Sequence, residues 1–139
     1  MAYTDYPTIQ HAWFEEVWNK SNAAAIDDLC TDNVVGHGLV DAQGNEVNTR
    51  EGFKSFYQAF RGAFPDIHVD VLETATEGDN VVARCLVRAT HTGEGFVVPP
   101  TGIQVEFTGM SWVKVKDSKI KESWNSFDFL TVMQQLGAV

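Results

Sequence analysis

The chain has 139 residues, of which 44% are hydrophobic and 21% charged, as is usual for one compact soluble domain. Nineteen acidic residues against ten basic ones give a formal net charge of −9, which repels phosphate backbones and anionic lipid headgroups. Neither nucleic acid nor a membrane surface is therefore expected as a partner. Cys30 and Cys85 stand apart from any metal-ligand spacing, so no disulfide framework and no metal site are expected.

The N-terminal part of the chain is predicted to be helical. It lacks the basic and apolar segments of a signal peptide, so a cytoplasmic protein is expected. Ile9, Trp13 and Val17 recur at helical spacing and predict a first helix over about residues 8–20. A short second helix is expected over about residues 23–30.

A third helix is predicted after a short strand over residues 34–39. Asn48, with Glu51 three residues later, resembles a capping box at its start, and Pro65 ends it. One face of this helix is almost wholly aromatic. The residues of that face are Phe53, Phe56, Tyr57, Phe60 and Phe64.

The second half of the chain alternates between apolar and polar residues and predicts a sheet. Long strands are expected over residues 67–76, 81–92, 104–116 and 119–127, joined by turns that favour antiparallel pairing. Helices followed by such a sheet are typical of an α+β fold. The absence of linkers and repeats indicates a single domain over residues 1–139.

Strict alternation in the last strand places Trp124, Ser126 and Asp128 on the inward side, with Asp128 opposite Phe107. Met110 and Trp112 then fall on the outer face of the sheet. Two large apolar side chains there predict a homodimer through this face. The alternative is that they are isolated exposed residues.

Several short motifs from the third helix onward share their order and spacing with a known family. The motifs are Phe64-Pro65-Asp66, Glu77-Gly78-Asp79, Thr90-His91-Thr92-Gly93, Pro99-Pro100-Thr101-Gly102, Lys119-Ile120, Trp124, Asp128 and Gln135-Leu136-Gly137. In this respect the chain resembles the SnoaL-like polyketide cyclases of the NTF2-like superfamily. The resemblance implies a cone-shaped α+β barrel, in which a curved antiparallel sheet wraps around three N-terminal helices and encloses an apolar pocket.

The resemblance also implies a catalytic aspartate. In the family, an aspartate at the place of Asp128 is the acid/base of an intramolecular aldol cyclisation, and desolvation near an apolar pocket would make it a better base. The alternative is that Asp128 caps the last helix.

Two histidines are further catalytic candidates. His91 is expected to face inward near the pocket mouth, where it could hydrogen-bond Asp128 or a substrate oxygen, and the alternative is a structural histidine. His37 lies between two glycines that could leave room for a ligand or mark a bulge.

Aromatic side chains are the candidate walls of the pocket, although such rings are more often plain core. Phe107 is expected to face inward, and the Tyr57 hydroxyl could orient a ligand carbonyl. The candidate substrate-binding residues are Phe53, Phe56, Tyr57, Phe107 and Trp124.

The leading functional hypothesis is a cyclase or isomerase that needs no cofactor and acts on a small apolar carbonyl compound. The first alternative is a non-catalytic protein that binds an apolar ligand. An epoxide hydrolase is less favoured, because Arg84 and Arg88 point outward by alternation. The loop over residues 93–102 is expected to form a rim or lid.

Overall fold

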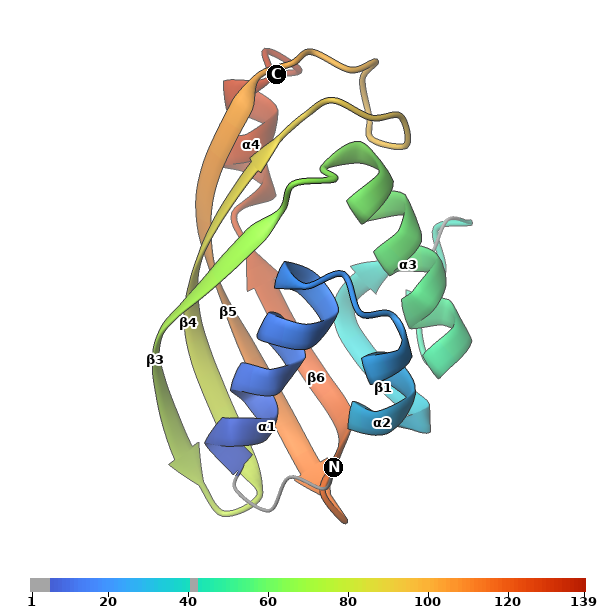
Figure 1. The fold of residues 1–139 in the computed structure, drawn as a ribbon, viewed down its shortest axis with the longest axis vertical. Coiled ribbons are helices and arrows are strands. Elements are labelled where there is room, and N and C mark those ends of the chain that lie inside the picture. The colour runs from blue at the N-terminus through green and yellow to red at the C-terminus, as the bar shows by residue number, and fades with distance from the viewer. Residues whose placement is uncertain (1–5, 41–42) are drawn as a thin grey trace.

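The structure is a computed structural model that describes residues 6–40 and 43–139. Its helices precede or flank one long sheet (Figure 1). The helices are α1 Tyr6–Ala12, the π-helix η1 Trp13–Asn19, α2 Ala24–Leu29, α3 Arg50–Ala63 and α4 Phe129–Gln135. The strands are β1 Cys30–Val40, β2 Glu46–Val47, β3 His68–Glu77, β4 Asn80–Thr90, β5 Gln104–Lys116 and β6 Lys119–Phe127.

The six strands form one curved sheet in the order β2-β1-β6-β5-β4-β3. Neighbouring strands are antiparallel except β1 and β6, which pair in parallel. The sheet does not close on itself, and Figure 1 shows α1, α2 and α3 over one of its faces, with α4 beside the end of the long strands. The α+β fold expected from the sequence is therefore confirmed.

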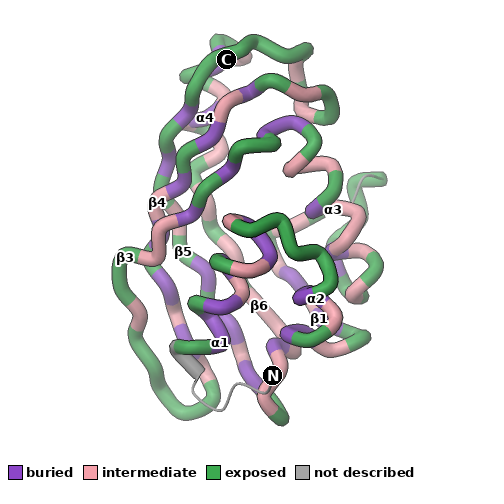
Figure 2. Tube along the Cα trace, in the orientation of Figure 1, coloured by how far each residue is buried: buried purple, intermediate pink, exposed green. Residues whose placement is uncertain are grey.

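Alternating side chains on the long strands build the core against these helices. Val81, Ala83, Cys85 and Val87 of β4 are buried while the residues between them are more exposed, and Figure 2 shows this alternation along the strands. The buried face of β4 and β5 lies under the helices.

The first helix forms where it was predicted, but its second half is π-helical. The Lys20 N–H donates to the Glu15 carbonyl at 2.9 Å, five residues earlier, which is the hydrogen bond of a π-helix. This wider turn brings side chains five residues apart onto one side of the helix. Trp13 and Trp18 are so spaced, and both line the cavity described below.

The helix α3 starts one residue later than the predicted capping box. The cap is Thr49, whose side chain accepts a hydrogen bond from the Gly52 N–H at 2.9 Å. The helix ends at Ala63, two residues before Pro65.

The strand β6 contains a bulge that corrects the predicted alternation. Glu122 pairs with Lys114 and Ile120 pairs with Val115, so Lys121 is left as an extra residue. An extra residue reverses which side chains face inward beyond it. The predicted inward position of Trp124 and Asp128 is therefore wrong, since both are exposed. The side chains that line cavities instead are Ser123, Asn125 and Phe127.

Candidate functional site

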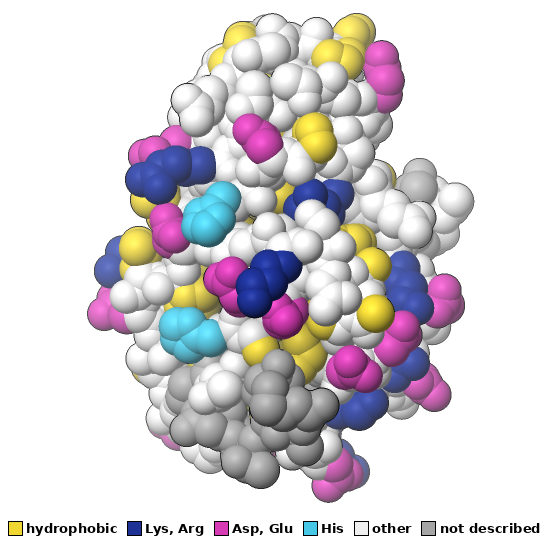
Figure 3. Space-filling view, viewed as in Figure 1, with side chains coloured by type: hydrophobic (Ala, Val, Ile, Leu, Met, Phe, Trp, Pro, Cys, Tyr) yellow, Lys and Arg dark blue, Asp and Glu magenta, His cyan; other side chains and the backbone are white. Residues whose placement is uncertain are grey.

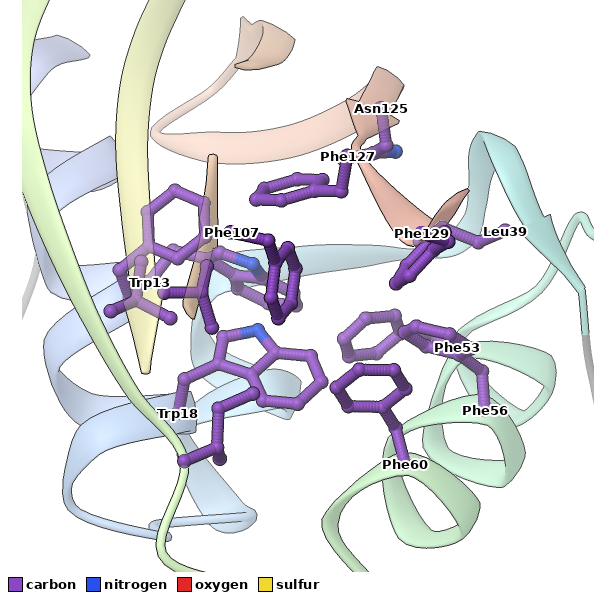
Figure 4. A pocket seen from close by; sticks show the side chains of 14 residues that line it. Trp13, Trp18, Leu39, Phe53, Phe56, Phe60, Phe107, Asn125, Phe127 and Phe129 are labelled. Atoms are coloured by element: carbon purple, nitrogen blue, oxygen red, sulfur yellow. The ribbon is translucent and has the colours of Figure 1, made fainter. Parts of the chain in front are cut away.

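A cavity of about 60 Å³ lies between the helices and the inner face of the sheet. Among the residues that the structure describes, its wall contains nine aromatic residues, four aliphatic ones and a single polar residue, Asn125 (Figure 4). The wall residues are Trp13, Phe14, Trp18, Leu39, Phe53, Phe56, Phe60, Ile67, Val69, Val87, Phe107, Asn125, Phe127 and Phe129. Such a wall suits an apolar ligand with rings.

Helical spacing explains how α3 supplies its part of the wall. Phe53, Phe56 and Phe60 follow one another at three and four residues, so they share one side of the helix. Phe53 packs against Trp13 with ring centroids 4.8 Å apart, and Phe56 packs against Trp18 at 6.1 Å. These contacts connect α3 to η1 across the cavity (Figure 4).

A second, smaller cavity of about 30 Å³ adjoins the first. The two share Trp13, Leu39, Phe53 and Asn125 as wall residues. The Trp13–Phe53 ring pair thus borders both spaces, and movement of these rings would join them. The second cavity is the more polar, because Ser111 and Ser123 also line it.

Half-buried wall residues indicate where a ligand would enter. Leu39, Phe56, Phe60 and Phe129 are only partly buried and come from β1, α3 and α4. Trp13, Asn125 and Phe127 are also partly buried, whereas Phe107 and Val87 are buried. A benzene-sized cavity measures about 150 Å³. The half-buried rings must therefore rotate outward to admit a ring-bearing compound.

Three of the predicted wall residues, Phe53, Phe56 and Phe107, line the main cavity. Tyr57 does not line it. Its hydroxyl donates to the Val17 carbonyl at 2.7 Å, and burial raises the pKa of this phenol. Trp124 is 40% exposed on the opposite face of the sheet, because of the bulge in β6.

Asp128 is an exposed residue that caps α4. Its carboxylate accepts hydrogen bonds from the Thr131 N–H at 3.0 Å and the Thr131 hydroxyl at 2.6 Å. These bonds lower the pKa of Asp128 below its ordinary value of 3.8, the opposite of what desolvation does to a buried general base. In the chain, Asp128 nevertheless directly follows Phe127 and precedes Phe129, and both of these phenylalanines line the cavity.

His91 is fully buried at the end of the sheet, behind the cavity wall. Its Nδ1 accepts a hydrogen bond from the Thr101 N–H at 3.3 Å, and its ring packs against Phe64 and Phe96 at centroid distances of 5.2 and 5.9 Å. Nδ1 as acceptor places the proton of a neutral ring on Nε2, which has no hydrogen-bond partner among the described residues. The loop over residues 93–102 covers this end through Phe96 and supplies none of the cavity wall.

His37 faces the outer side of the sheet, away from both cavities. Its Nε2 lies 2.7 Å from Glu122 and its Nδ1 lies 3.5 Å from Glu46. Its ring stacks on Trp124 at 5.3 Å. The neighbouring Gly36 takes the inward position on β1 and lines the second cavity.

The structure therefore does not bring Asp128, His91 and His37 together. No hydrogen bond joins any two of them within the described ranges. The cavity wall also contains residues that local sequence patterns do not assign to it. The unassigned wall residues include Trp18, Phe60, Asn125, Phe127 and Phe129. Helical spacing places Phe60 on the aromatic face of the third helix, but nothing in the local sequence reveals the bulge that turns Asn125 inward.

Large apolar side chains line up across the outer face of the sheet. In the strand register, Val82 lies beside Trp112, Trp112 beside Trp124, and Trp124 beside His37. Trp112 is 46% exposed and the adjoining Met110 is 51% exposed. Arg84 and Arg88 also lie on exposed positions and pair with Glu73 and Glu106, each at 2.8 Å.

Charges are interspersed on the helix-covered side of the molecule. Figure 3 shows Lys, Arg, Asp and Glu side chains mixed across this view, with no single acidic patch. An example is Lys20, which lies 3.2 Å from Glu16. In the part of the chain that is described, no helix has the length and apolar character needed to cross a bilayer.

A family model and solved structures relate the chain to known proteins. The family model of the SnoaL-like polyketide cyclases matches residues 9–136. IdmH from Streptomyces antibioticus, a candidate polyketide cyclase, is 28% identical with a TM-score of 0.81 over 96% of this chain and 99% of that one. AclR from Streptomyces galilaeus, a candidate hydroxylase, is 26% identical with a TM-score of 0.80 over 97% of this chain and 99% of that one. A comparison with curated proteins gives no match.

Proposed function

Since the chain belongs to the SnoaL-like polyketide cyclase family, we propose that it binds a small apolar carbonyl compound of polyketide type in the aromatic cavity and promotes its ring closure. The observation that carries this proposal is the cavity wall, whose described residues include nine aromatic ones and one polar one. Burial and offset or edge-to-face contacts favour planar rings and folded unsaturated chains in such a space.

The chemical contribution would be mainly one of positioning. Asn125, the polar residue of the wall, does not titrate, and the other described wall residues are apolar. Binding holds a flexible poly-carbonyl chain folded, with its reacting carbons close together. The chain therefore loses its conformational entropy on binding and not in the reaction step, which lowers the barrier to ring closure. Compounds of this type are already activated for carbon–carbon bond formation by their flanking carbonyl groups.

A variant that blocks the mouth tests this proposal. Leu39→Trp places a large ring on a half-buried wall residue, whereas Val40→Trp places the same ring on the adjacent exposed residue and serves as the control. With a panel of linear poly-carbonyl thioester analogues, we expect the wild type and Val40→Trp to accelerate cyclisation and Leu39→Trp to lose this effect. Equal rates with and without the wild-type protein would refute the catalytic part, and binding without acceleration would identify a non-catalytic ligand-binding protein.

Acid/base cyclisation by Asp128 is the second candidate function. It is favoured by the position of Asp128 between the cavity residues Phe127 and Phe129. It requires the carboxylate to leave Thr131 and turn toward the ligand, because both hydrogen bonds to Thr131 now hold it outward. The Asp128→Asn variant described in the Discussion separates the two candidates.

A further inference from the structure

Asn125 lies where the two cavities meet and forms a polar site within an otherwise apolar wall. It lines both cavities, and two serines that line the smaller one, Ser111 and Ser123, contact it. Ser111 is 3% exposed, while Ser123 and Asn125 are partly buried. A polar group in such a place either satisfies a neighbour or orients a ligand.

The hydrogen bonds of Asn125 fix which way its amide points. Nδ2 donates to the His37 backbone carbonyl at 3.1 Å and to the Ser123 hydroxyl oxygen at 2.9 Å. A backbone carbonyl only accepts, so the nitrogen must lie on this side of the amide. Figure 4 shows Asn125 at the edge of the cavity, on the same strand as Phe127.

The remaining hydrogen-bonding capacity of the amide is an acceptor. Both N–H groups are used, and Oδ1 accepts one hydrogen bond, from the Ser111 hydroxyl at 3.0 Å. A carbonyl oxygen can accept two hydrogen bonds, so with respect to the described residues Oδ1 keeps one free acceptor position, and the amide nitrogen has no donor left. At Oδ1 itself a ligand carbonyl would find no partner, whereas a ligand hydroxyl would.

We propose that Asn125 Oδ1 accepts a hydrogen bond from a phenolic or enolic hydroxyl, and so selects hydroxylated ring compounds for the aromatic cavity. This inference rests on the proposed function, because it assumes that the cavity binds a ring-bearing ligand. One net hydrogen bond to a partly buried acceptor changes affinity by roughly tenfold. Because the amide is neutral, the hydroxyl keeps its proton when bound.

The test compares 1-naphthol with 1-methylnaphthalene, which is similar in size and lacks the hydroxyl. Dissociation constants are measured by equilibrium dialysis for the wild type, for Asn125→Leu and for Ser126→Ala, a control on the exposed neighbouring residue of β6. We expect Asn125→Leu to weaken 1-naphthol binding about tenfold more than 1-methylnaphthalene binding. The Ser126→Ala control should leave the ratio of the two constants unchanged.

An unchanged ratio in Asn125→Leu would overturn the inference while leaving the proposed function intact. If the wild type bound neither compound, both the inference about Asn125 and the proposed function would fail. Should Asn125→Leu not fold, the side-chain amide signals of Asn125 in the NMR spectrum of the wild type provide the second measurement. We expect 1-naphthol to shift these signals more than 1-methylnaphthalene does, and equal shifts would overturn the inference.

Discussion

Two hydrogen bonds from Thr131 hold the Asp128 carboxylate at the start of α4. Asparagine and aspartate are about equally good helix caps, while alanine is a poor one. We therefore expect Asp128→Asn to keep both the melting temperature and the rate of cyclisation, and Asp128→Ala to lower the melting temperature by about 4 °C. Differential scanning calorimetry and the cyclisation assay measure these effects. A fall in rate of roughly two to four decades in Asp128→Asn would instead support the general-base candidate.

The hydrogen bonds from Thr131 to Asp128 also determine how the stability of the fold depends on pH. Because the hydrogen bonds favour the charged form, the pKa of Asp128 is lower in the folded chain than its ordinary value of 3.8. The stabilisation is thus fully present above that value and is lost as the pH falls through the lower folded pKa. We expect Thr131→Val to raise the pKa of Asp128 toward 3.8, as followed by NMR titration of the carboxyl carbon. A pKa that does not respond would show that the Thr131 hydroxyl has no such effect.

Both cysteines should be unreactive in the folded chain. Burial raises the pKa of the Cys85 thiol to about 12 and that of Cys30 to about 11, so almost no thiolate forms at neutral pH. We expect no reaction with a thiol-specific reagent at pH 8 under native conditions and labelling of both thiols in denaturant. Mass spectrometry distinguishes the sites, and rapid native labelling of either thiol would contradict its burial.

At the level of elements, local patterns predicted the four long strands β3 to β6 well, whereas β1 is longer than the predicted residues 34–39 and β2 was not predicted. The bounds of β5 and β6 are those expected from the alternation, and the turn between them forms as predicted. The orientation of Asn125 and Trp124 could not be predicted in this way, because the bulge at Lys121 arises from how β6 pairs with β5. The candidate site is therefore formed by the wall residues beside Asp128 and not by Asp128 itself. The outward position of His37 is likewise set by the pairing of β1 with β6, which the local sequence does not show.

A close approach between strands keeps Phe127 in the cavity wall. Gly109 of β5 lies opposite Phe127 of β6, and a Cβ added at Gly109 would collide with the Phe127 ring and lie 2.8 Å from its Cα. We expect Gly109→Ala to displace Phe127, lower the melting temperature and weaken 1-naphthol binding. Thr108→Ala, at the exposed neighbouring position, is the control. If Gly109→Ala had the melting temperature and the 1-naphthol affinity of the wild type, then β5 and β6 could separate there at no cost in free energy.

At the scale of the whole molecule, we expect two copies to pair through the outer face of the sheet. Trp112, Trp124 and Met110 are exposed there, and single-copy proteins seldom expose such a set together. A two-fold axis would place this surface against its own copy. Sedimentation velocity at micromolar concentration should show a dimer for the wild type and a monomer for the Met110→Lys, Trp112→Lys double variant. A monomeric wild type would rule the dimer out.

Intermolecular NMR contacts test most directly whether a ligand binds in the aromatic cavity. With 1-naphthol bound to the isotope-labelled chain, we expect nuclear Overhauser effects between ligand protons and the rings of Trp13, Trp18 and Phe60, which line the cavity. Contacts confined to Trp112 and Trp124 on the outer face, or none at saturating ligand, would contradict a ligand-binding cavity.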